Sequence, residues 1–536
     1  MKRSDFPLNK KSRTVRFVQN FLCTGLYQIT AMIMGFITPR LMILHYGSEV
    51  NGLIVSVTSF LTYFKMVEAG LAAAAIAALY KPLAEQDQSR ISGVVSAARR
   101  LYNKAGWLFS FMTMAFAAVY PFVVPVVGAD GISMTHLSEM LLILAMGISG
   151  ALEFFTLSRY RVLLTADQKT YIVSLASMAS LLLSTALLVV LPFLGADVIV
   201  VRLAASLTIL VRSVLLRRYT MRNYPEVNAF APPTKGAIKS HWDALLFELT
   251  NVIQQGAGVI LASLITRDAG ILSAYGLYHM VTEGLWGILK MGTTGIYSIF
   301  GNLLVSEDKQ SFSRAYRDFE CLYHFLCSIL FGVAAILIVP FVNLYTHGVH
   351  DAEYNLPLMG MLIIADALTN QGKIPLNLMI SSSGRFREVR WHCILQIVVT
   401  MAVGAGLGVL GLRYGAVMSV CGILVGVICG NVTRIACKLS FVPKNITGVP
   451  WQESLVRIVR MLVTTAVIAA PCLLFVNPPQ RFFTWFMYAA VLLIYATLVS
   501  LVSARLFDKP AFSSLLSRGK AIMNSLLRPH TNQQED

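Results

Sequence analysis

The 536-residue sequence contains few charged residues: Asp, Glu, Lys and Arg make up 13% of it, about half the share in a soluble domain. Apolar residue types make up 56%, and a soluble protein of this length could not bury that much apolar surface. The composition therefore excludes an ordinary soluble domain and predicts an all-α, lipid-embedded protein. The net charge of +17 comes from Lys and Arg clustered between long apolar runs. This pattern is typical of membrane topology, so we expect no nucleic-acid partner.

Motifs for metal, redox and nucleotide chemistry are missing as well. The eight cysteines show no CxxC spacing and the nine histidines form no HxxxH pair, so we expect neither a metal site nor a cofactor. The sequence has no GxxxxGK[ST] loop, which argues against ATP-driven transport. The longest outer loop, around residues 346–356, is too short for a catalytic domain. We therefore expect no enzyme, and a membrane glycosyltransferase or polysaccharide polymerase is the disfavoured alternative.

Long apolar runs dominate the sequence, and a helix that crosses a bilayer needs about 20 such residues. The first run is far longer than the apolar part of a signal peptide and no cleavage site follows it, so we expect it to remain as a helix. The pattern predicts about fourteen transmembrane helices, at residues 17–44, 52–77, 105–127, 136–157, 170–193, 197–216, 241–266, 272–300, 320–346, 356–381, 391–411, 414–436, 453–476 and 482–504.

The loops between these runs alternate in positive charge. The first sixteen residues hold six Lys and Arg, and every second loop after them is basic. The intervening loops hold only Arg267, Arg413 and Arg481. This positive-inside pattern predicts a multi-pass inner-membrane protein with both termini in the cytoplasm, and it requires an even number of helices.

Two loops of the sequence resemble each other and indicate an internal repeat. Residues 83–102 and 304–323 share Leu, Asp, Ser, Leu and Tyr at one offset, although two unrelated amphipathic loops are the alternative. Because the offset equals six helices, it predicts two six-helix lobes in the same membrane orientation, a parallel repeat, followed by two C-terminal helices. The predicted parts are a basic cytoplasmic N-terminus (1–16), a first lobe (17–216), a cytoplasmic linker (217–240), a second lobe (241–440), the two appended helices (441–504) and a basic amphipathic cytoplasmic tail (505–536).

Charged residues inside the predicted spans are candidates for function, because a charge there costs about 2.5–3.5 kcal/mol or more and usually faces a cavity or a partner. Lys65 and Glu68 are three residues apart on the second helix, so they share a face, where they either line a path or neutralise each other. Glu283 and Lys290 share a face of the eighth helix. These two helices correspond in the predicted repeat, so we favour a lumen-facing role. The candidates are Arg40, Lys65, Glu68, Glu153, Arg202, Glu248, Glu283, Lys290, Asp366 and Lys373.

Other cations could bind an anionic substrate near a membrane surface. Arg40 follows Pro39, and its guanidinium either extends to the interface or grips phosphate or carboxylate on the substrate path. Lys373, near the cytoplasmic end of the tenth helix, could bind an anionic headgroup. Arg159 and Arg161 at the matching end of the fourth helix are better interpreted as topology anchors.

Two carboxylates occupy nearly matching places in the fourth and tenth helices. Glu153 or Asp366 could bind a proton or sodium ion for coupling, or form a salt bridge with a neighbour. The predicted substrate-binding residues are Arg40, Lys65, Glu68, Glu283, Lys290 and Lys373, with Glu153 and Asp366 as coupling candidates and no catalytic residue or metal ligand.

A family resemblance is carried by residues 38–87, TPRLMILHYGSEVNGLIVSVTSFLTYFKMVEAGLAAAAIAALYKPLAEQD. Its features are the arginine after proline, YGSEVNGL, the glutamate before GL, and LYKPLA followed by an acidic residue. This segment resembles the bacterial polysaccharide repeat-unit flippases (Wzx type) of the multidrug/oligosaccharidyl-lipid/polysaccharide exporter (MOP) superfamily. The second half of the chain is similar in its helix plan rather than in motifs.

The resemblance implies a transporter that moves undecaprenyl-diphosphate-linked oligosaccharide repeat units across the inner membrane by alternating access. It implies a role in O-antigen lipopolysaccharide, capsule or exopolysaccharide biosynthesis, and two six-helix bundles around a central cavity. The implied partners are the lipid-linked oligosaccharide, membrane lipids, a polysaccharide polymerase and glycosyltransferases. Arg40, Lys65 and Glu68 lie on the matching segment, and the two cations are candidate diphosphate ligands because a diphosphate in an apolar core needs positive partners.

Two alternatives within the same superfamily stay open. An ion-coupled multidrug or cation exporter would favour acidic residues in its cavity, whereas the candidate charges here are of both signs. A lipid II flippase for cell-wall synthesis is compatible with the same features.

Overall fold

The computed structural model describes residues 10–126, 134–228, 230–233, 242–293, 296, 300, 303–304, 309–475, 481–509, 512–513 and 517. Within this part of the chain all regular secondary structure is helical and no strand occurs. The predicted all-α fold class is therefore confirmed. The predicted N-terminal segment, the linker and the amphipathic tail lie partly outside the described residues.

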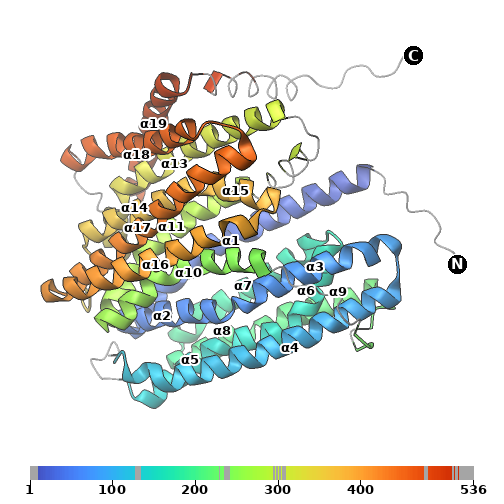
Figure 1. Cartoon of the computed structure of the whole chain (residues 1–536). Helices are drawn as coiled ribbons and strands as arrows, with labels where there is room; N and C mark the ends of the chain where they lie inside the picture. Colours follow the sequence, from blue (N-terminus) through green and yellow to red (C-terminus); the bar gives the residue numbers. More distant parts are fainter. Residues whose placement is uncertain are drawn as a thin grey trace. The chain divides into compact units, whose positions relative to one another are not determined.

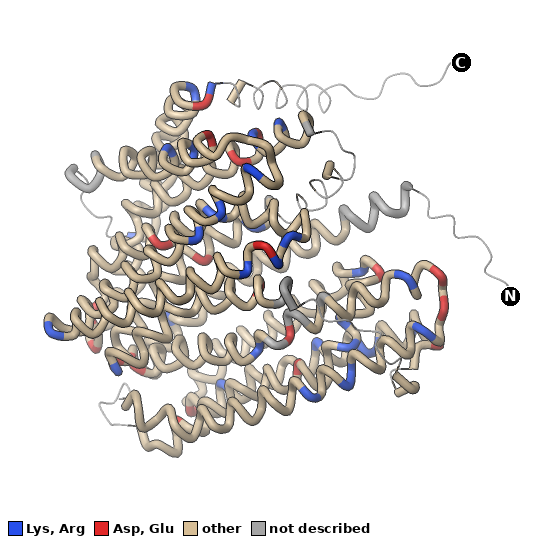
Figure 2. The backbone as a smooth tube through the Cα atoms, in the orientation of Figure 1, with Lys and Arg blue, Asp and Glu red and all other residues tan. Residues whose placement is uncertain are grey.

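Among the described residues, ten helical stretches are long and apolar enough to cross a membrane. They are Gln19–Tyr46, Gln88–Phe122, His136–Ala166, Thr170–Phe193, Val198–Asn223, Leu246–Thr266, Gln310–Tyr345, Phe386–Tyr414, Ala416–Thr447 and Phe482–Phe507. Figure 2 shows that long parts of the helices carry no charged residue. The protein is thus a multi-pass membrane protein, while the count of fourteen helices stays a prediction.

The chain divides into two compact units, of which the first contains Met1–Met280, Gly348–Glu353 and Gly408–Ile423. It is coloured mainly blue to green in Figure 1. Its helices are α1 (Lys10–Tyr46), α2 (Ser48–Phe64), α3 (Val67–Glu85), α4 (Gln88–Val119), α5 (His136–Leu152), α6 (Ser158–Ala166), α7 (Thr170–Phe193), α8 (Val198–Leu207), α9 (Ile209–Asn223), α10 (Trp242–Thr266) and the first half of α11 (Ala269–Thr293).

The second unit contains Val281–His347, Tyr354–Leu407 and Leu424–Asp536. Within it, α13 packs against the two C-terminal helices and against α14. Ile329, Leu337, Ile468 and Ala496 belong to the apolar core of this packing. The helices of the unit are α13 (Lys309–Tyr345), α14 (Pro357–Gly372), α15 (Ile374–Ser383), most of α16 (Phe386–Gly411) and of α17 (Ala416–Val442), α18 (Trp451–Phe475) and α19 (Phe482–Phe507).

Several predicted spans are interrupted helices. The span at 52–77 consists of α2 and α3 with a turn at Lys65–Met66, and the span at 197–216 breaks at Thr208 between α8 and α9. The span at 136–157 continues from α5 into the π-helical segment η2 (Glu153–Leu157) and then into α6. The span at 356–381 breaks at Lys373 between α14 and α15. Charged residues predicted from sequence thus stand at three of the four interruptions.

Helix ends in the first unit follow ordinary capping chemistry. The Asp87 carboxylate accepts a hydrogen bond from the backbone N–H of Arg90 at 3.0 Å and begins α4. Asp197 likewise accepts from the N–H of Ile199 at 2.7 Å and begins α8. An acceptor at this position satisfies a backbone donor that has no partner within the helix. These local signals place the starts of two helices whose inner faces form the site described below.

Close packing in the first unit depends on a glycine in α2. A Cβ atom on Gly52 would collide with the carbonyl oxygen of Ala269 at the start of α11. Only glycine permits this approach of two helix backbones. The α2 helix therefore lies directly against the start of α11, and it also packs on α10.

Hydroxyl groups join the same helices in the interior of the first unit. Tyr120 donates to Ser56 on α2 at 2.7 Å and lies 2.8 Å from the Ser263 hydroxyl on α10, while Ser56 donates to Ser263 at 3.0 Å. The Asn51 amide donates to the Ser273 hydroxyl at 2.9 Å. We call Ser56, Tyr120 and Ser263 the hydroxyl triad, and none of its contacts involves a charge.

Candidate functional site: a cationic cavity in the first unit

A cavity of about 360 Å³ lies among α1, α2, α4, α5, α7, α8 and α9 of the first unit. Its ionised lining side chains are Lys65, Arg202 and Arg212, and none of the described residues that line it is Asp or Glu. Nine lining residues carry a hydroxyl group, among them Ser177 and Ser180 on α7. A mixture of cations and hydroxyls in a partly enclosed space suits a ligand that is anionic and rich in hydrogen-bonding groups.

Behind the cavity wall, Glu153 is the centre of a group of ion pairs. Its Oε2 lies 3.1 Å from Nζ of Lys65, and its Oε1 lies 3.1 Å from Nη1 of Arg161 and 3.5 Å from Nη1 of Arg212. Arg161 also pairs with Glu68. We call Lys65, Glu68, Glu153, Arg161 and Arg212 the Glu153 cluster. Its three cations outnumber its two carboxylates, so the cluster carries a net positive charge.

The helix interruptions place the members of the Glu153 cluster. Lys65 ends α2, and Glu153 begins the π-helical segment. A π segment contains one extra residue per turn and re-aims the side chains at its ends, which is why such segments are frequent at functional sites. Glu153 itself is 9% exposed, and a buried carboxylate is stable only when it is paired.

Gly150 makes room for the side chain of Lys65. A Cβ at position 150 would lie 2.7 Å from Cε of Lys65 and would also collide with the ring of Phe109. The aliphatic part of the Lys65 side chain therefore packs against Gly150 of α5, where no side chain is present, and the ammonium group reaches Glu153. Since Gly150 lines the cavity together with Lys65 and Phe109, this position controls both the shape of the cavity and the ion pair.

The structure brings three of the predicted residues together, with partners that the sequence did not indicate. Lys65 and Glu68 do not neutralise each other: Lys65 pairs with Glu153, and Glu68 pairs with Arg161. The reason is the turn at Lys65–Met66, which ends the helix on which the two side chains would have shared a face. Arg40 lies half-buried on α1 and is not among the residues that line the cavity.

Three arginines of the site have contacts that the sequence does not indicate. Arg161, for which we expect a role as a topology anchor, bridges Glu68 and Glu153. Arg202 was a candidate charge without a role, and Arg212 was not singled out although it lies inside the predicted span 197–216. Its place within a span was the available signal, because an ionisable residue there is a functional candidate by default.

In the second unit, the Asn431 side chain links two predicted residues, Asp366 and Lys373, near the helix break at Lys373. The side-chain Oδ1 of Asn431 accepts hydrogen bonds from Nζ of Lys373 and from Nε2 of Gln396, both at 2.9 Å. Its Nδ2 donates to Oδ1 of Asp366 at 2.9 Å. Gln396 in turn accepts from Arg434 at 2.7 Å. Asp366 and Lys373 thus belong to one buried network, linked through an amide.

The predicted pair on the eighth span belongs to the second unit. Glu283 and Lys290 lie on the part of α11 that follows Met280, and both side chains are exposed. The Lys290 ammonium lies 4.8 Å from the centre of the Trp286 ring, a cation–π contact. The structure does not place either residue in the cavity of the first unit.

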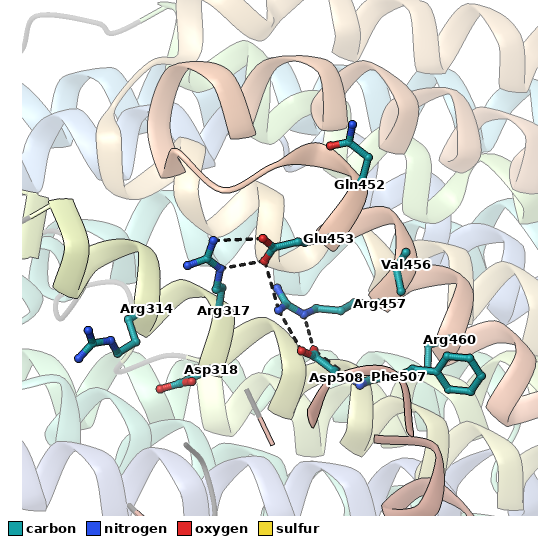
Figure 3. A pocket seen from close by; sticks show the side chains of 10 residues that line it. All are labelled: Arg314, Arg317, Asp318, Gln452, Glu453, Val456, Arg457, Arg460, Phe507 and Asp508. Atoms are coloured by element: carbon teal, nitrogen blue, oxygen red, sulfur yellow. Dashed lines mark hydrogen bonds and ion pairs between the residues drawn. The ribbon is translucent and has the colours of Figure 1, made fainter. Parts of the chain in front are cut away.

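A larger cavity of about 780 Å³ opens at the first turns of α13 and α18 and the end of α19. Three of its four arginines pair with carboxylates (Figure 3): Arg317 makes two bonds to Glu453, at 2.8 and 3.1 Å, and Arg457 and Arg460 pair with Asp508. Arg457 lies 2.6 Å from Asp508 and 2.9 Å from Glu320, which is fully buried. Because three carboxylates line this cavity beside its four arginines, it is a weaker candidate for an anion than the one in the first unit.

The comparisons with known proteins concern the fold. No protein-family model matches the sequence, and no curated protein matches it. A solved inward-facing multidrug resistance MATE family transporter of the MOP superfamily has a TM-score of 0.56 at 12% identity, over 82% of this chain and 96% of that one. The lipid II flippase MurJ in an inward closed conformation has a TM-score of 0.59 at 14% identity, over 91% of this chain and 99% of that one. This chain has the same fold as these two proteins.

A further solved neighbour is described by the polarity of its binding pocket. A third neighbour, a MOP superfamily transporter from Pyrococcus furiosus described as having a pocket of reverse polarity, has a TM-score of 0.51 at 13% identity, over 83% of this chain and 96% of that one. These neighbours are transporters and flippases. At such low sequence identities a structural similarity shows a shared fold and not a shared substrate. The substrate of this protein therefore has to be inferred from its own charged residues.

Proposed function

We propose that this protein is a flippase that moves undecaprenyl-diphosphate-linked oligosaccharide repeat units across the bacterial inner membrane by alternating access. The transported repeat units would serve the biosynthesis of a surface polysaccharide such as O-antigen, capsule or exopolysaccharide. The MOP fold supplies a transporter scaffold, and residues 38–87 supply the resemblance to this class of flippase.

The observation that carries this proposal is the sign of the charge around the cavity in the first unit. Lys65, Arg202 and Arg212 line it, whereas the two nearby carboxylates, Glu68 and Glu153, are held in ion pairs. A diphosphate is stabilised by such cations, whereas a cationic drug would be repelled. The charge therefore favours an anionic substrate over the multidrug or cation exporter.

A lipid II flippase is the second candidate. The likeness to MurJ, which covers 91% of this chain, favours it. The two candidates differ in what accumulates when the gene is removed, so a single strain separates them.

The test is a deletion strain in which lipid-linked intermediates and surface glycan are analysed. We expect undecaprenyl-linked repeat units to accumulate on the cytoplasmic side and surface polysaccharide to be lost, while cell-wall synthesis continues. Accumulation of lipid II would favour the second candidate. Normal surface glycan in a strain without a redundant transporter would reject the proposal, and increased drug susceptibility alone would favour the exporter.

The proposed setting is the inner membrane with both termini in the cytoplasm, together with a polysaccharide polymerase and glycosyltransferases. Reporter fusions at the N- and C-termini test the orientation, because alkaline phosphatase is active only outside the cytoplasm. Glu153 and Asp366 stay the proposed sites for a coupling ion, and transport assays under imposed proton and sodium gradients in their Gln and Asn variants test them.

A further inference from the structure

Two residues of the first unit belong both to the cavity wall and to the Glu153 cluster. Lys65 and Arg212 line the cavity and at the same time pair with Glu153, at 3.1 and 3.5 Å. A ligand in the cavity therefore meets these cations from one side while Glu153 holds them from the other. An anionic ligand and Glu153 are competitors for the same two positive charges.

The cavity also contains donors that the cluster does not use. Arg202 lines the cavity and forms none of the ion pairs recorded for the described residues, and its buried Nε has no hydrogen-bond partner there. The Nε of Arg212 is likewise buried without a partner. Buried guanidinium donors without partners are energetically unfavourable, so these two groups are suited to a ligand with several acceptor oxygens.

Glu153 can release two of its cations without becoming an unpaired buried charge. Arg161, which does not line the cavity, stays 3.1 Å from Oε1 of Glu153 and also contacts Glu68. The cluster carries one excess positive charge, and Arg202 adds another. A doubly charged anion therefore balances the charge of the whole group, while Arg161 remains the ion-pair partner of both carboxylates.

From this geometry we propose that the cavity is a diphosphate site that works by ion-pair exchange, in which the diphosphate takes Lys65 and Arg212 from Glu153. Because Lys65 ends α2 and Glu153 begins the π-helical segment, the exchange changes the contacts at two helix interruptions at once. The volume of about 360 Å³ is at the small end of ligand pockets, so it takes the diphosphate and adjoining sugar and leaves the lipid outside. Only the assignment of this diphosphate to a lipid-linked glycan rests on the proposed function.

The test uses the purified full-length protein in detergent with inorganic pyrophosphate as the probe, measured by calorimetry. We expect Arg202→Ala to weaken binding about tenfold or more, because it removes a charge-assisted donor. We expect Glu153→Gln to tighten binding, because the competing charge is gone. Arg90→Ala is the matched control, since Arg90 is exposed and pairs with Glu85 and Asp87 outside the cavity, and it should leave the affinity unchanged.

Several outcomes would overturn the proposal. Unchanged binding in a folded Arg202→Ala protein would reject the site, and unchanged or weaker binding in a folded Glu153→Gln protein would reject the exchange. Equal affinity for sulfate and pyrophosphate would mean that the cavity is a general anion site. A short-chain polyprenyl-diphosphate sugar should displace pyrophosphate; failure to do so would remove the lipid-linked source and leave free diphosphate as the ligand.

The experiment separates this inference from the proposed function. Pyrophosphate binding that follows the expected variant pattern, combined with normal surface glycan in the deletion strain, would reject the function and keep the site. Loss of surface glycan without pyrophosphate binding would reject the site and keep the function.

Discussion

At the scale of single residues, the Glu153 carboxylate is the shared ion-pair partner of three cations in the interior of the first unit. Removing one partner of a buried ion pair typically destabilises a protein by about 3–5 kcal/mol, because the remaining charge is left uncompensated. The Glu153→Ala variant should therefore unfold at a lower temperature than the wild type in a detergent thermal-shift assay. Glu388→Ala, which removes an exposed carboxylate, is the control and should leave the transition in place. Equal transitions for both variants would mean that the cluster contributes nothing to stability.

Gly150 offers a second test at this scale, because a side chain there would displace Lys65. We expect Gly150→Val to reduce transport strongly, since a Cβ would lie 2.7 Å from Cε of Lys65. The measurement is complementation of the deletion strain. Gly35→Val is the control, because no atom lies within 4 Å of a Cβ at that position. Full complementation by Gly150→Val would show that the path of Lys65 across α5 is not required.

The residue types of the site could be predicted, but their pairing could not. Lys65, Glu68 and Glu153 can be predicted as candidates from the sequence, because each is a charged residue within a long apolar run. Which charges meet depends on the rotation of each helix about its axis, and a turn or a π segment changes that rotation. The pairing of Glu68 with Arg161 rather than Lys65 is the result.

At the scale of helices, interruptions recur where buried polar groups meet. The network around Asn431 lies by the break at Lys373, just as the Glu153 cluster lies by the turn at Lys65–Met66. An interrupted helix exposes backbone groups that a continuous helix would satisfy internally, and such helices commonly border binding sites in transporters. Each unit of the protein therefore contains a group of polar side chains at a helix break, the Glu153 cluster in the first unit and the Asn431 network in the second.

Replacing Asn431 tests whether this network stabilises the second unit. Asn431→Leu removes the acceptor of Lys373 and Gln396 and the donor to Asp366. Each buried polar group left without a partner costs about 1–3 kcal/mol, so we expect a clear decrease in thermal stability. Val432→Ala changes an exposed neighbour on the same helix and should have little effect. Equal stability of the two variants would contradict the role of the network.

The positions of helices follow from the sequence better than their interruptions do. Gly372 and Pro375 flank the break at Lys373, so this break carried a local signal. The segment Glu153–Leu157, with the sequence EFFTL, contains neither glycine nor proline. It begins at Glu153, whose ion pairs join residues far apart in the sequence, and no local pattern predicts its π-helical geometry.

At the scale of the whole molecule, alternating access would require α2 to separate from α10 and α11 during transport. A disulfide between cysteines at positions 51 and 273 should prevent this, because the Asn51 and Ser273 side chains are in hydrogen-bonding contact at 2.9 Å. We expect the Asn51→Cys/Ser273→Cys variant, with its native cysteines replaced, to lose transport under oxidising conditions and recover it on reduction. Each single variant serves as the control, and undiminished transport by the cross-linked protein would mean that these helices stay together throughout the cycle.

The fold class follows from composition, because a chain with 13% charged residues and long apolar runs has to satisfy its backbone within helices in a membrane. The substrate does not follow in this way. It depends on which charges face a cavity, and the cavity of the first unit is lined by Arg202 and Arg212, for which the sequence indicates no role.

The neutral chemistry of the hydroxyl triad has a consequence for kinetics. Ser56, Tyr120 and Ser263 join α2 to α10 through contacts of 2.7–3.0 Å without any ion pair, and a hydrogen bond of this kind contributes about 0.5–1.5 kcal/mol net. Water can replace each partner when the helices part. If α2 and α10 separate during transport, these contacts should therefore resist the separation less than ion pairs would, and we expect the turnover time to depend on the charged sites more than on the hydroxyl triad.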